Sequence, residues 1–201
     1  MRIYLPLKFK GNRNYLHGSD FFNEISFHAD ELTGDVRSYI KRISFRQFAD
    51  TACVITDKEP TNKDVLIGHV EFQVCNKGAS SKFWIIKTDE KEDSRYPYDE
   101  DLVLSRATLN MQEHSGKIVD MSYYTLIEYV IALTKHLNYA VCPLVSGKWV
   151  FGQLDVEKPM QSGCQTLEIR MKNLIPARFS VNDILVDGEK VGIMKFIVSE
   201  A

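Results

Sequence analysis

The chain has 201 residues, of which 44% are hydrophobic and 26% are charged, which is the composition of an ordinary globular protein. Its formal net charge of −2 excludes the strongly basic surface that attracts nucleic acid or an anionic membrane. No apolar run is long enough to span a bilayer, and the N-terminal residues lack the unbroken apolar core of a signal peptide. We therefore expect a cytoplasmic protein with no nucleic-acid or membrane partner.

The first half of the chain is predicted to contain a strand over residues 2–9 and a short helix over residues 21–32. Ser19 or Asp20 is a typical N-cap for that helix, and Gly34 is a typical helix stop. β-branched and aromatic residues then dominate three strand-like runs, at residues 39–56, 64–75 and 82–88.

A charged segment follows at residues 88–101, with the sequence TDEKEDSRYPYDED. It contains a proline and lacks aliphatic side chains, which is typical of a solvated linker. We therefore predict two halves, residues 1–95 and residues 96–201.

The second half repeats the order of elements of the first. Residues 102–109 favour a strand, and a polar loop that contains His114 follows. A helix is predicted over residues 122–137, with Ser122 as its N-cap and Asn138 near its end. Its apolar side chains cover almost every face, which is typical of a buried helix. Three or four strands are then predicted at residues 148–156, 165–174, 178–188 and 190–200, with Asp187 and Gly188 turning the last hairpin.

Each half places a histidine ahead of a glutamate on a predicted helix. His17 precedes Glu24 in the first half, and His114 precedes Glu128 in the second. Imidazole is the side chain best suited to proton transfer near neutral pH. A carboxylate among the apolar neighbours of Glu128 needs a hydrogen-bonding partner or a chemical role. The repeated order is the pattern that an ancient duplication leaves.

The four cysteines form no CxxC pair, which favours reduced thiols over disulfides. No histidine or cysteine spacing matches a metal site, and no glycine-rich motif matches a nucleotide site. We therefore expect neither a metal nor another cofactor.

Three segments of the second half resemble the hotdog fold, and in particular the β-hydroxyacyl-thioester dehydratases of fatty acid synthesis. The segments are LIEYVIAL (126–133), similar to the helix with the catalytic acid, VFGQLDVEKPMQSGCQTLEI (150–169), similar to a Pro-Gly strand, and ILVDGEKVGIMKFIV (184–198), similar to the closing hairpin. The helix also resembles that of the tandem hotdog domains of A-factor biosynthesis. The resemblance implies an α+β double hotdog, in which each half is a curved antiparallel sheet wrapped around a central helix.

The resemblance also implies the residues of an active site. Hotdog dehydratases pair a loop histidine of one repeat with a helix acid of the other. The implied pairs are His17 with Glu128 and His114 with Glu24, and we favour the first. Substrate-binding positions are expected at Asp20, which would also orient His17, and at Gly116, Ser122 and Tyr124.

The function implied is that of an enzyme acting on acyl thioesters of acyl carrier protein or coenzyme A. Our first hypothesis is dehydration of a 3-hydroxyacyl thioester by a His/Glu acid–base pair. A thioesterase, a β-ketoacyl transferase of the γ-butyrolactone type and a non-catalytic acyl- or carrier-binding protein stay open. The sequence His114-Ser115-Gly116-Lys117 favours the last, because dehydratases have His-Phe-Pro-Gly at this loop. Both a complete monomer and a homodimer stay open as well.

Overall fold

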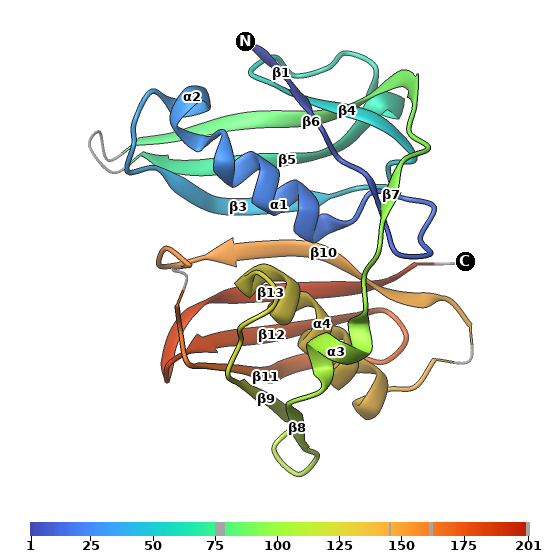
Figure 1. Ribbon diagram of the computed structural model, residues 1–201, viewed down its shortest axis with the longest axis vertical. Coiled ribbons are helices and arrows are strands. Elements are labelled where there is room, and N and C mark those ends of the chain that lie inside the picture. The colour runs from blue at the N-terminus through green and yellow to red at the C-terminus, as the bar shows by residue number, and fades with distance from the viewer. Residues whose placement is uncertain (75–78, 145, 161–162, 200–201) are drawn as a thin grey trace. The chain divides into compact units, whose positions relative to one another are not determined.

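The computed structural model describes residues 1–74, 79–144, 146–160 and 163–199 (Figure 1). The chain divides into two compact units, Met1–Tyr98 and Asp99–Ala201. Each unit combines an antiparallel sheet with helices, so the architecture is α+β.

The first unit contains two helices, a short 3₁₀ turn and the strands of two sheets. In chain order these are β1 (Arg2–Leu5), β2 (Phe9–Lys10), α1 (Gly18–Phe27), α2 (Ala29–Thr33), β3 (Tyr39–Phe45), β4 (Thr51–Thr56), η1 (Lys63–Val65), β5 (Leu66–Val74), β6 (Ala79–Lys91) and β7 (Arg95–Tyr96). The larger sheet has the order β1-β4-β6-β5-β3 within this unit, with antiparallel neighbours. The smaller sheet pairs β2 with β7 in parallel and sets Lys10 beside Tyr96.

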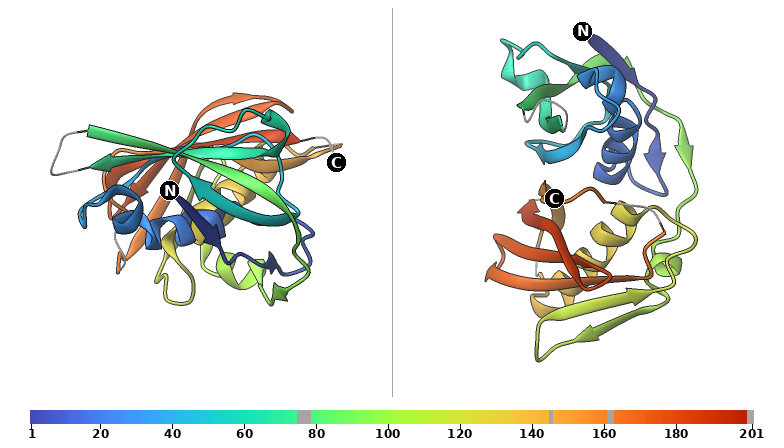
Figure 2. Two further views of the ribbon diagram at one scale, coloured as in Figure 1. Left: turned by 90° about the horizontal axis from the view of Figure 1, so that it is seen from above. Right: turned by 90° about the vertical axis from the view of Figure 1, so that its left-hand side faces the viewer.

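Helix α1 lies against one face of the larger sheet of the first unit (Figures 1 and 2). Phe21 and Ile25 lie one helical turn apart and are 1% and 0% exposed. The ring of Phe21 is 5.4 Å from that of Phe45 on β3. Burying a side chain of this size contributes about 1.5–3 kcal/mol. This apolar stripe fixes the first turn of α1, and with it His17, against the sheet.

The start of α1 differs from the prediction. The helix begins at Gly18 and its N-cap is His17, not Ser19 or Asp20. The reason is that the Ser19 and Asp20 side chains contact Lys10 instead of capping the helix. Gly34, with φ of 69° in the left-handed region, ends α2 as predicted.

The strand predictions for this unit were partly wrong. The run 39–56 is two strands, β3 and β4, with residues 46–50 between them. The segment 88–101 is not a loop throughout, because β6 continues to Lys91 and β7 occupies Arg95–Tyr96. Backbone pairing with β4 and β2 holds these charged residues in strands.

The second unit contains two helices and one sheet. In chain order its elements are α3 (Glu100–Leu104), β8 (Ala107–Asn110), β9 (Ser115–Val119), α4 (Leu126–Val141), β10 (Lys148–Val156), β11 (Thr166–Ile175), β12 (Phe179–Val186) and β13 (Glu189–Ser199). The strand order within the unit is β10-β13-β12-β11-β9-β8, with antiparallel neighbours. α4 packs across β9, β10, β11 and β12 (Figure 2), as predicted for a buried central helix.

Two predictions in this unit were wrong. Residues 100–104 form α3 rather than the start of a strand, because Asp99 caps them with hydrogen bonds to Asp101 N and Leu102 N. α4 begins at Leu126 with Thr125 as its N-cap, so Ser122 lies outside the helix. The helix also continues past Asn138, to Val141.

The four strands predicted after α4 are confirmed to within two residues. Asp187 and Gly188 form the last hairpin turn with φ of 49° and 83°. Both values lie in the left-handed region that a two-residue hairpin turn requires. These two residues therefore explain the hairpin that joins β12 to β13.

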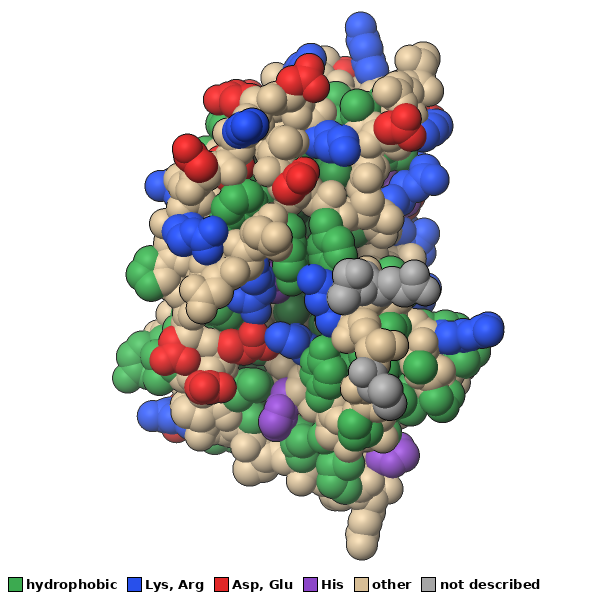
Figure 3. All heavy atoms as spheres, turned by 90° about the vertical axis from the view of Figure 1, so that its right-hand side faces the viewer, with side chains coloured by type: hydrophobic (Ala, Val, Ile, Leu, Met, Phe, Trp, Pro, Cys, Tyr) green, Lys and Arg blue, Asp and Glu red, His purple; other side chains and the backbone are tan. Residues whose placement is uncertain are grey.

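The structure also bears on the expectations for membrane helices, cysteines and surface charge. Over the described residues, no helix combines the length and the apolar character needed to cross a membrane. Cys53, Cys142 and Cys164 are free thiols, and Cys75 lies outside the described residues. On the face drawn in Figure 3, acidic and basic side chains lie interspersed.

Candidate functional site

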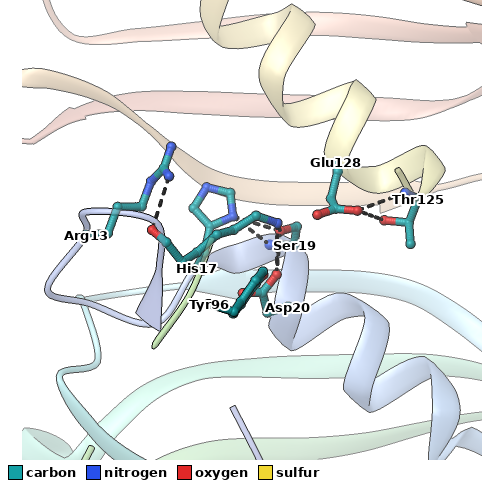
Figure 4. Close-up of polar contacts among 8 residues, drawn as sticks. Arg13, His17, Ser19, Asp20, Tyr96, Thr125 and Glu128 are labelled. Carbon is teal, nitrogen blue, oxygen red and sulfur yellow. Dashed lines mark hydrogen bonds and ion pairs between the residues drawn. The ribbon is translucent and has the colours of Figure 1, made fainter. Parts of the chain in front are cut away.

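His17 stands at the N-terminus of α1 (Figure 4). Its backbone is extended, with φ of −88° and ψ of 142°, and its carbonyl accepts hydrogen bonds from Asp20 N and Phe21 N. Its Nδ1 atom is 3.4 Å from Ser19 N. The helix start therefore fixes both the backbone and the ring of His17, and the side chain is half-buried.

Ser19 joins His17 to the interior of the first unit. Its side chain is 0% exposed. Its Oγ atom is 2.8 Å from His17 Nδ1, accepts a hydrogen bond of 2.9 Å from Lys10 Nζ and donates one of 2.9 Å to Asp20 Oδ1. The Ser19 hydroxyl thus connects the imidazole of His17 to the ammonium group of Lys10 and the carboxylate of Asp20.

Asp20 accepts hydrogen bonds on both carboxylate oxygens. Lys10 Nζ and Ser19 Oγ donate to Oδ1, at 3.1 and 2.9 Å, and the Tyr96 hydroxyl donates to Oδ2 at 2.8 Å. Asp20 was predicted to orient His17. In the structure it reaches the imidazole through the hydroxyl of Ser19.

Lys10 is the most unusual residue of this cluster, because its side chain is 0% exposed. Burying an unpaired ammonium group is very costly, whereas pairing and hydrogen bonding offset the cost. Asp20 supplies the opposite charge at 3.1 Å. The aromatic rings of Tyr98 and Tyr96 lie 4.2 and 5.8 Å from Nζ, so their faces stabilise the cation further.

These contacts define a His17 cluster made of His17, Ser19, Asp20, Lys10 and Tyr96. An imidazole at its half-buried end can exchange protons with a substrate, and the rest of the cluster orients it. The Ser19 hydroxyl resembles an activated nucleophile, with a base at 2.8 Å. Ser19 is fully buried, so the half-buried ring of His17 is the more accessible of the two groups.

Glu128, the acid favoured by the sequence, lies on α4 in the second unit and is 9% exposed. Its Oε2 atom accepts hydrogen bonds of 2.8 Å from both Thr125 N and Thr125 Oγ1 (Figure 4). This is the carboxylate half of a capping box, with Glu128 at the third helical position. The box explains the buried carboxylate in structural terms.

The capping box also changes the distance from the helix start to Glu128. With Ser122 as the cap, Glu128 would lie about 9 Å along the helix from its start. With Thr125 as the cap, the separation is about 4.5 Å, and the carboxylate folds back to the helix start.

The second predicted pair occupies ordinary surface positions. His114 is exposed in the turn between β8 and β9, with φ of 46°, and its carbonyl accepts from Met171 N at 2.9 Å. Glu24 pairs with His28 Nε2 at 3.2 Å, one turn along α1.

The remaining predicted substrate-binding positions all lie in the second unit. Gly116 is buried in β9, where an added Cβ would lie 2.9 Å from Leu109 Cδ2 and 3.0 Å from Leu133 Cδ1, so close packing requires glycine. Ser122 is exposed in the segment before α4. The Tyr124 hydroxyl donates to Asp99 O at 3.3 Å.

Sequence reasoning missed Lys10, Tyr96 and Tyr98. Lys10 follows the strand predicted over residues 2–9, and both tyrosines fell in the segment taken for a linker. The pairing of β2 with β7 unites residues 86 positions apart, from Lys10 to Tyr96. The one available signal was the motif Tyr-Pro-Tyr in a run that otherwise lacks large apolar side chains.

Other titratable groups have shifted pKa values but stand apart from the His17 cluster. Burial, followed by the charge of Lys82, lowers the pKa of His69. Burial raises the pKa of the Cys53 thiol to about 12 and also raises the pKa of Cys164. These thiols are protonated near neutral pH and are poor nucleophiles. Within the described ranges, no group of three or more histidine, cysteine or acidic residues could hold a metal.

Comparison with known proteins rests on structure. No protein-family model and no curated protein matches the sequence. The TesB protein of Mycobacterium avium subs paratuberculosis is similar, with a TM-score of 0.51 at 8% identity over 96% of this chain and 91% of that one. A putative thioesterase from Novosphingobium aromaticivorans gives a TM-score of 0.50 at 10% identity over 99% and 94%. The chain has the hotdog fold.

This result confirms the predicted α+β hotdog fold. The dehydratase domain of PpsC from Mycobacterium tuberculosis, in complex with C12:1-CoA, is also similar, with a TM-score of 0.48 at 12% identity over 92% of this chain and 85% of that one. At such low sequence identity, these similarities indicate a shared fold and nothing about activity.

Proposed function

We propose that this hotdog protein acts on acyl thioesters and dehydrates a 3-hydroxyacyl thioester with His17 as the proton acceptor. The observation that carries the proposal is the half-buried imidazole of His17, tied through Ser19 to the buried Lys10–Asp20 pair. A similar structure with a TM-score of 0.50 is a putative thioesterase by name, which supports acyl thioesters as the class of substrate.

The proposed reaction needs one base and one acid. His17 takes the proton from the carbon next to the thioester carbonyl, and the electron pair left behind forms the carbon–carbon double bond. The bond from the β-carbon to its hydroxyl group breaks, and an acid protonates the departing oxygen to give water. General acid–base catalysis of this kind contributes about 10²–10⁴-fold to the rate.

Glu128 is the acid that the resemblance implies. Its capping bonds to Thr125 give it a structural role that explains its burial without catalysis. Its chemical role therefore stays a prediction, tested by a substitution that keeps the cap and removes the acid. The pairing of Glu128 with His17 also stays a prediction.

Thioester hydrolysis is the second candidate. It is favoured by the similar structure with a TM-score of 0.50, since that protein is a putative thioesterase by name. In that reaction His17 would take a proton from water, which attacks the thioester carbonyl and releases a free thiol. The two reactions share the base and differ in their products.

The experiment supplies the full chain with 3-hydroxyacyl thioesters of coenzyme A and of acyl carrier protein. Enoyl thioester is followed by its absorbance and free thiol by a thiol reagent. We expect enoyl product from the wild type, and a loss of about 10²–10⁴-fold in kcat/KM for His17→Asn. Asparagine is itself a good N-cap, so this variant removes the imidazole and keeps the helix start.

His136→Gln is the matched control, because His136 is an exposed histidine on α4 and its variant should retain full activity. Free thiol without enoyl product would favour hydrolysis. Saturable acyl-thioester binding without either product would leave a non-catalytic binding protein. Equal rates for the wild type and His17→Asn would overturn the role of His17.

A further inference from the structure

We infer that Ser19 and the buried Lys10–Asp20 pair are positioning residues that hold neutral His17 with its proton on Nδ1, so that Nε2 is the proton acceptor. The inference deepens the proposed function, since it names the atom that would take the proton. It follows from counting the protons and lone pairs around the Ser19 hydroxyl.

The Ser19 hydroxyl has one proton and two candidate acceptors. Asp20 Oδ1 is 2.9 Å away and His17 Nδ1 is 2.8 Å away. An ionised carboxylate is the stronger acceptor, because hydrogen bonds to charged groups are about twice as strong as neutral ones. The proton of Ser19 therefore points to Asp20.

The lone pairs of Ser19 Oγ then determine the state of His17. Lys10 Nζ is a hydrogen-bond donor without an acceptor lone pair, and it donates to one lone pair of Oγ at 2.9 Å. The other lone pair of Oγ faces His17 Nδ1 at 2.8 Å. A contact that short between a lone pair and a nitrogen requires a proton between them, so Nδ1 is the donor.

One contact favours the opposite tautomer. The backbone N–H of Ser19 lies 3.4 Å from His17 Nδ1, and it would donate to Nδ1 if that atom lacked a proton. A separation of 3.4 Å lies beyond the usual range of N–H donors, whereas 2.8 Å lies within it. The hydroxyl contact therefore outweighs the backbone contact.

The rest of the cluster keeps Ser19 in this arrangement. The Tyr96 hydroxyl holds Oδ2 of Asp20 at 2.8 Å, which leaves Oδ1 to face Ser19 and Lys10. Once Nε2 gains a proton, the imidazolium still donates through Nδ1 to Ser19. Its charge then faces the carboxylate of Asp20 across one hydroxyl, and the charge of Lys10 offsets part of that attraction.

The test is the tautomer of His17, read by ¹⁵N NMR on histidine-labelled protein through couplings to the ring carbon-bound protons. His17→Asn identifies the His17 signals. The measurement is made at a pH where the ring is neutral. We expect a protonated Nδ1 and an unprotonated Nε2 in the wild type, and a protonated Nε2 would overturn the inference without any further variant.

Ser19→Ala adds a second reading. Without Oγ, the Ser19 backbone N–H favours a proton on Nε2, so the tautomer should shift toward that form. Ser44→Ala is the matched control, because Ser44 Oγ lies 3.0 Å from Nδ1 of another histidine, His69. It should leave the His17 signals unchanged. An unchanged His17 tautomer in folded Ser19→Ala protein would contradict the positioning role.

Kinetics separates this inference from the proposed function. If dehydration occurs, Ser19→Ala should lower kcat about ten- to a hundredfold with little change in KM, because it misorients the base without touching the substrate. The NMR reading needs no substrate, so it stands if the protein proves not to be a dehydratase. If the protein dehydrates the substrate but NMR shows the proton on Nε2, the inference is wrong and the proposed function stands.

Discussion

At the scale of single residues, Lys10 explains most about the His17 cluster. A lysine with 0% exposure persists only where its charge is paired and its protons are bonded, and Asp20, Ser19 and the ring of Tyr98 meet those needs. The charged interior thus orients Ser19, which in turn orients His17. The sequence predicted that Asp20 would orient His17 but not the role of Lys10, because the ring of Tyr98 lies 88 positions away along the chain.

The pairing of Lys10 with Asp20 predicts a large effect on stability. Asp20→Asn removes the carboxylate 3.1 Å from the buried ammonium group of Lys10, so we expect the free energy of unfolding to fall by about 3–5 kcal/mol. Adding Lys10→Met to that variant removes the buried positive charge and should restore part of the loss. Urea unfolding measures both effects. Asp30→Asn, an exposed first-turn carboxylate on α2, is the control, and an Asp20→Asn cost as small as that of the control would contradict the pairing.

His69 predicts a pH dependence of stability. Burial lowers its pKa in the folded protein, and the facing charges of Lys82, Arg42 and Arg46 lower it further, against Glu71. The folded state therefore binds this proton less well than the unfolded state, whose histidine pKa is about 6.5. The stabilisation is fully present above about pH 6.5 and is lost as the pH falls through the folded pKa.

Urea unfolding at a series of pH values checks this prediction. His69→Gln should lose less stability than the wild type between about pH 7 and pH 5. Identical pH slopes for the two proteins would show that His69 does not contribute.

At the scale of elements, helix starts were the hardest features to predict. Ser122 and Thr125 are both good N-caps, and only the hydrogen bonds of Glu128 to Thr125 distinguish them. The hairpin at Asp187 and Gly188 was predictable because its turn needs two left-handed residues that few pairs supply. Local chemistry thus determined the hairpin, whereas the end of β6 depended on its pairing with β4.

The capping box predicts how Glu128 variants separate structure from catalysis. Glutamine also serves at the third position of a capping box, so Glu128→Gln should keep nearly the wild-type free energy of unfolding. Glu128→Ala should lose about 1 kcal/mol. Thermal unfolding and the enoyl assay are run on both variants.

Loss of activity in stable Glu128→Gln protein would support an acid role for Glu128. Full activity in that variant would limit Glu128 to capping the helix. Equal destabilisation by glutamine and alanine would contradict the capping role itself.

At the scale of the whole molecule, the fold was more predictable than the site. The order of helix and antiparallel strands in each half, with the segments around LIEYVIAL and VDGEKV, indicated a hotdog, and structural similarity over nearly the whole chain confirms that fold. Sequence patterns identified His17, yet the buried residues behind it needed the three-dimensional pairing of β2 with β7. The proposed reaction therefore rests on the imidazole of His17.

The most direct test of His17 as the base in dehydration is proton exchange at the substrate. A 3-hydroxyacyl thioester is incubated with the full chain in D₂O, and product and recovered substrate are analysed by mass spectrometry. We predict enoyl thioester, and deuterium next to the carbonyl of the recovered substrate, with the wild type and with His136→Gln, and neither with His17→Asn. Wild-type protein that yields neither, or His17→Asn protein that yields both at the wild-type rate, would contradict the account.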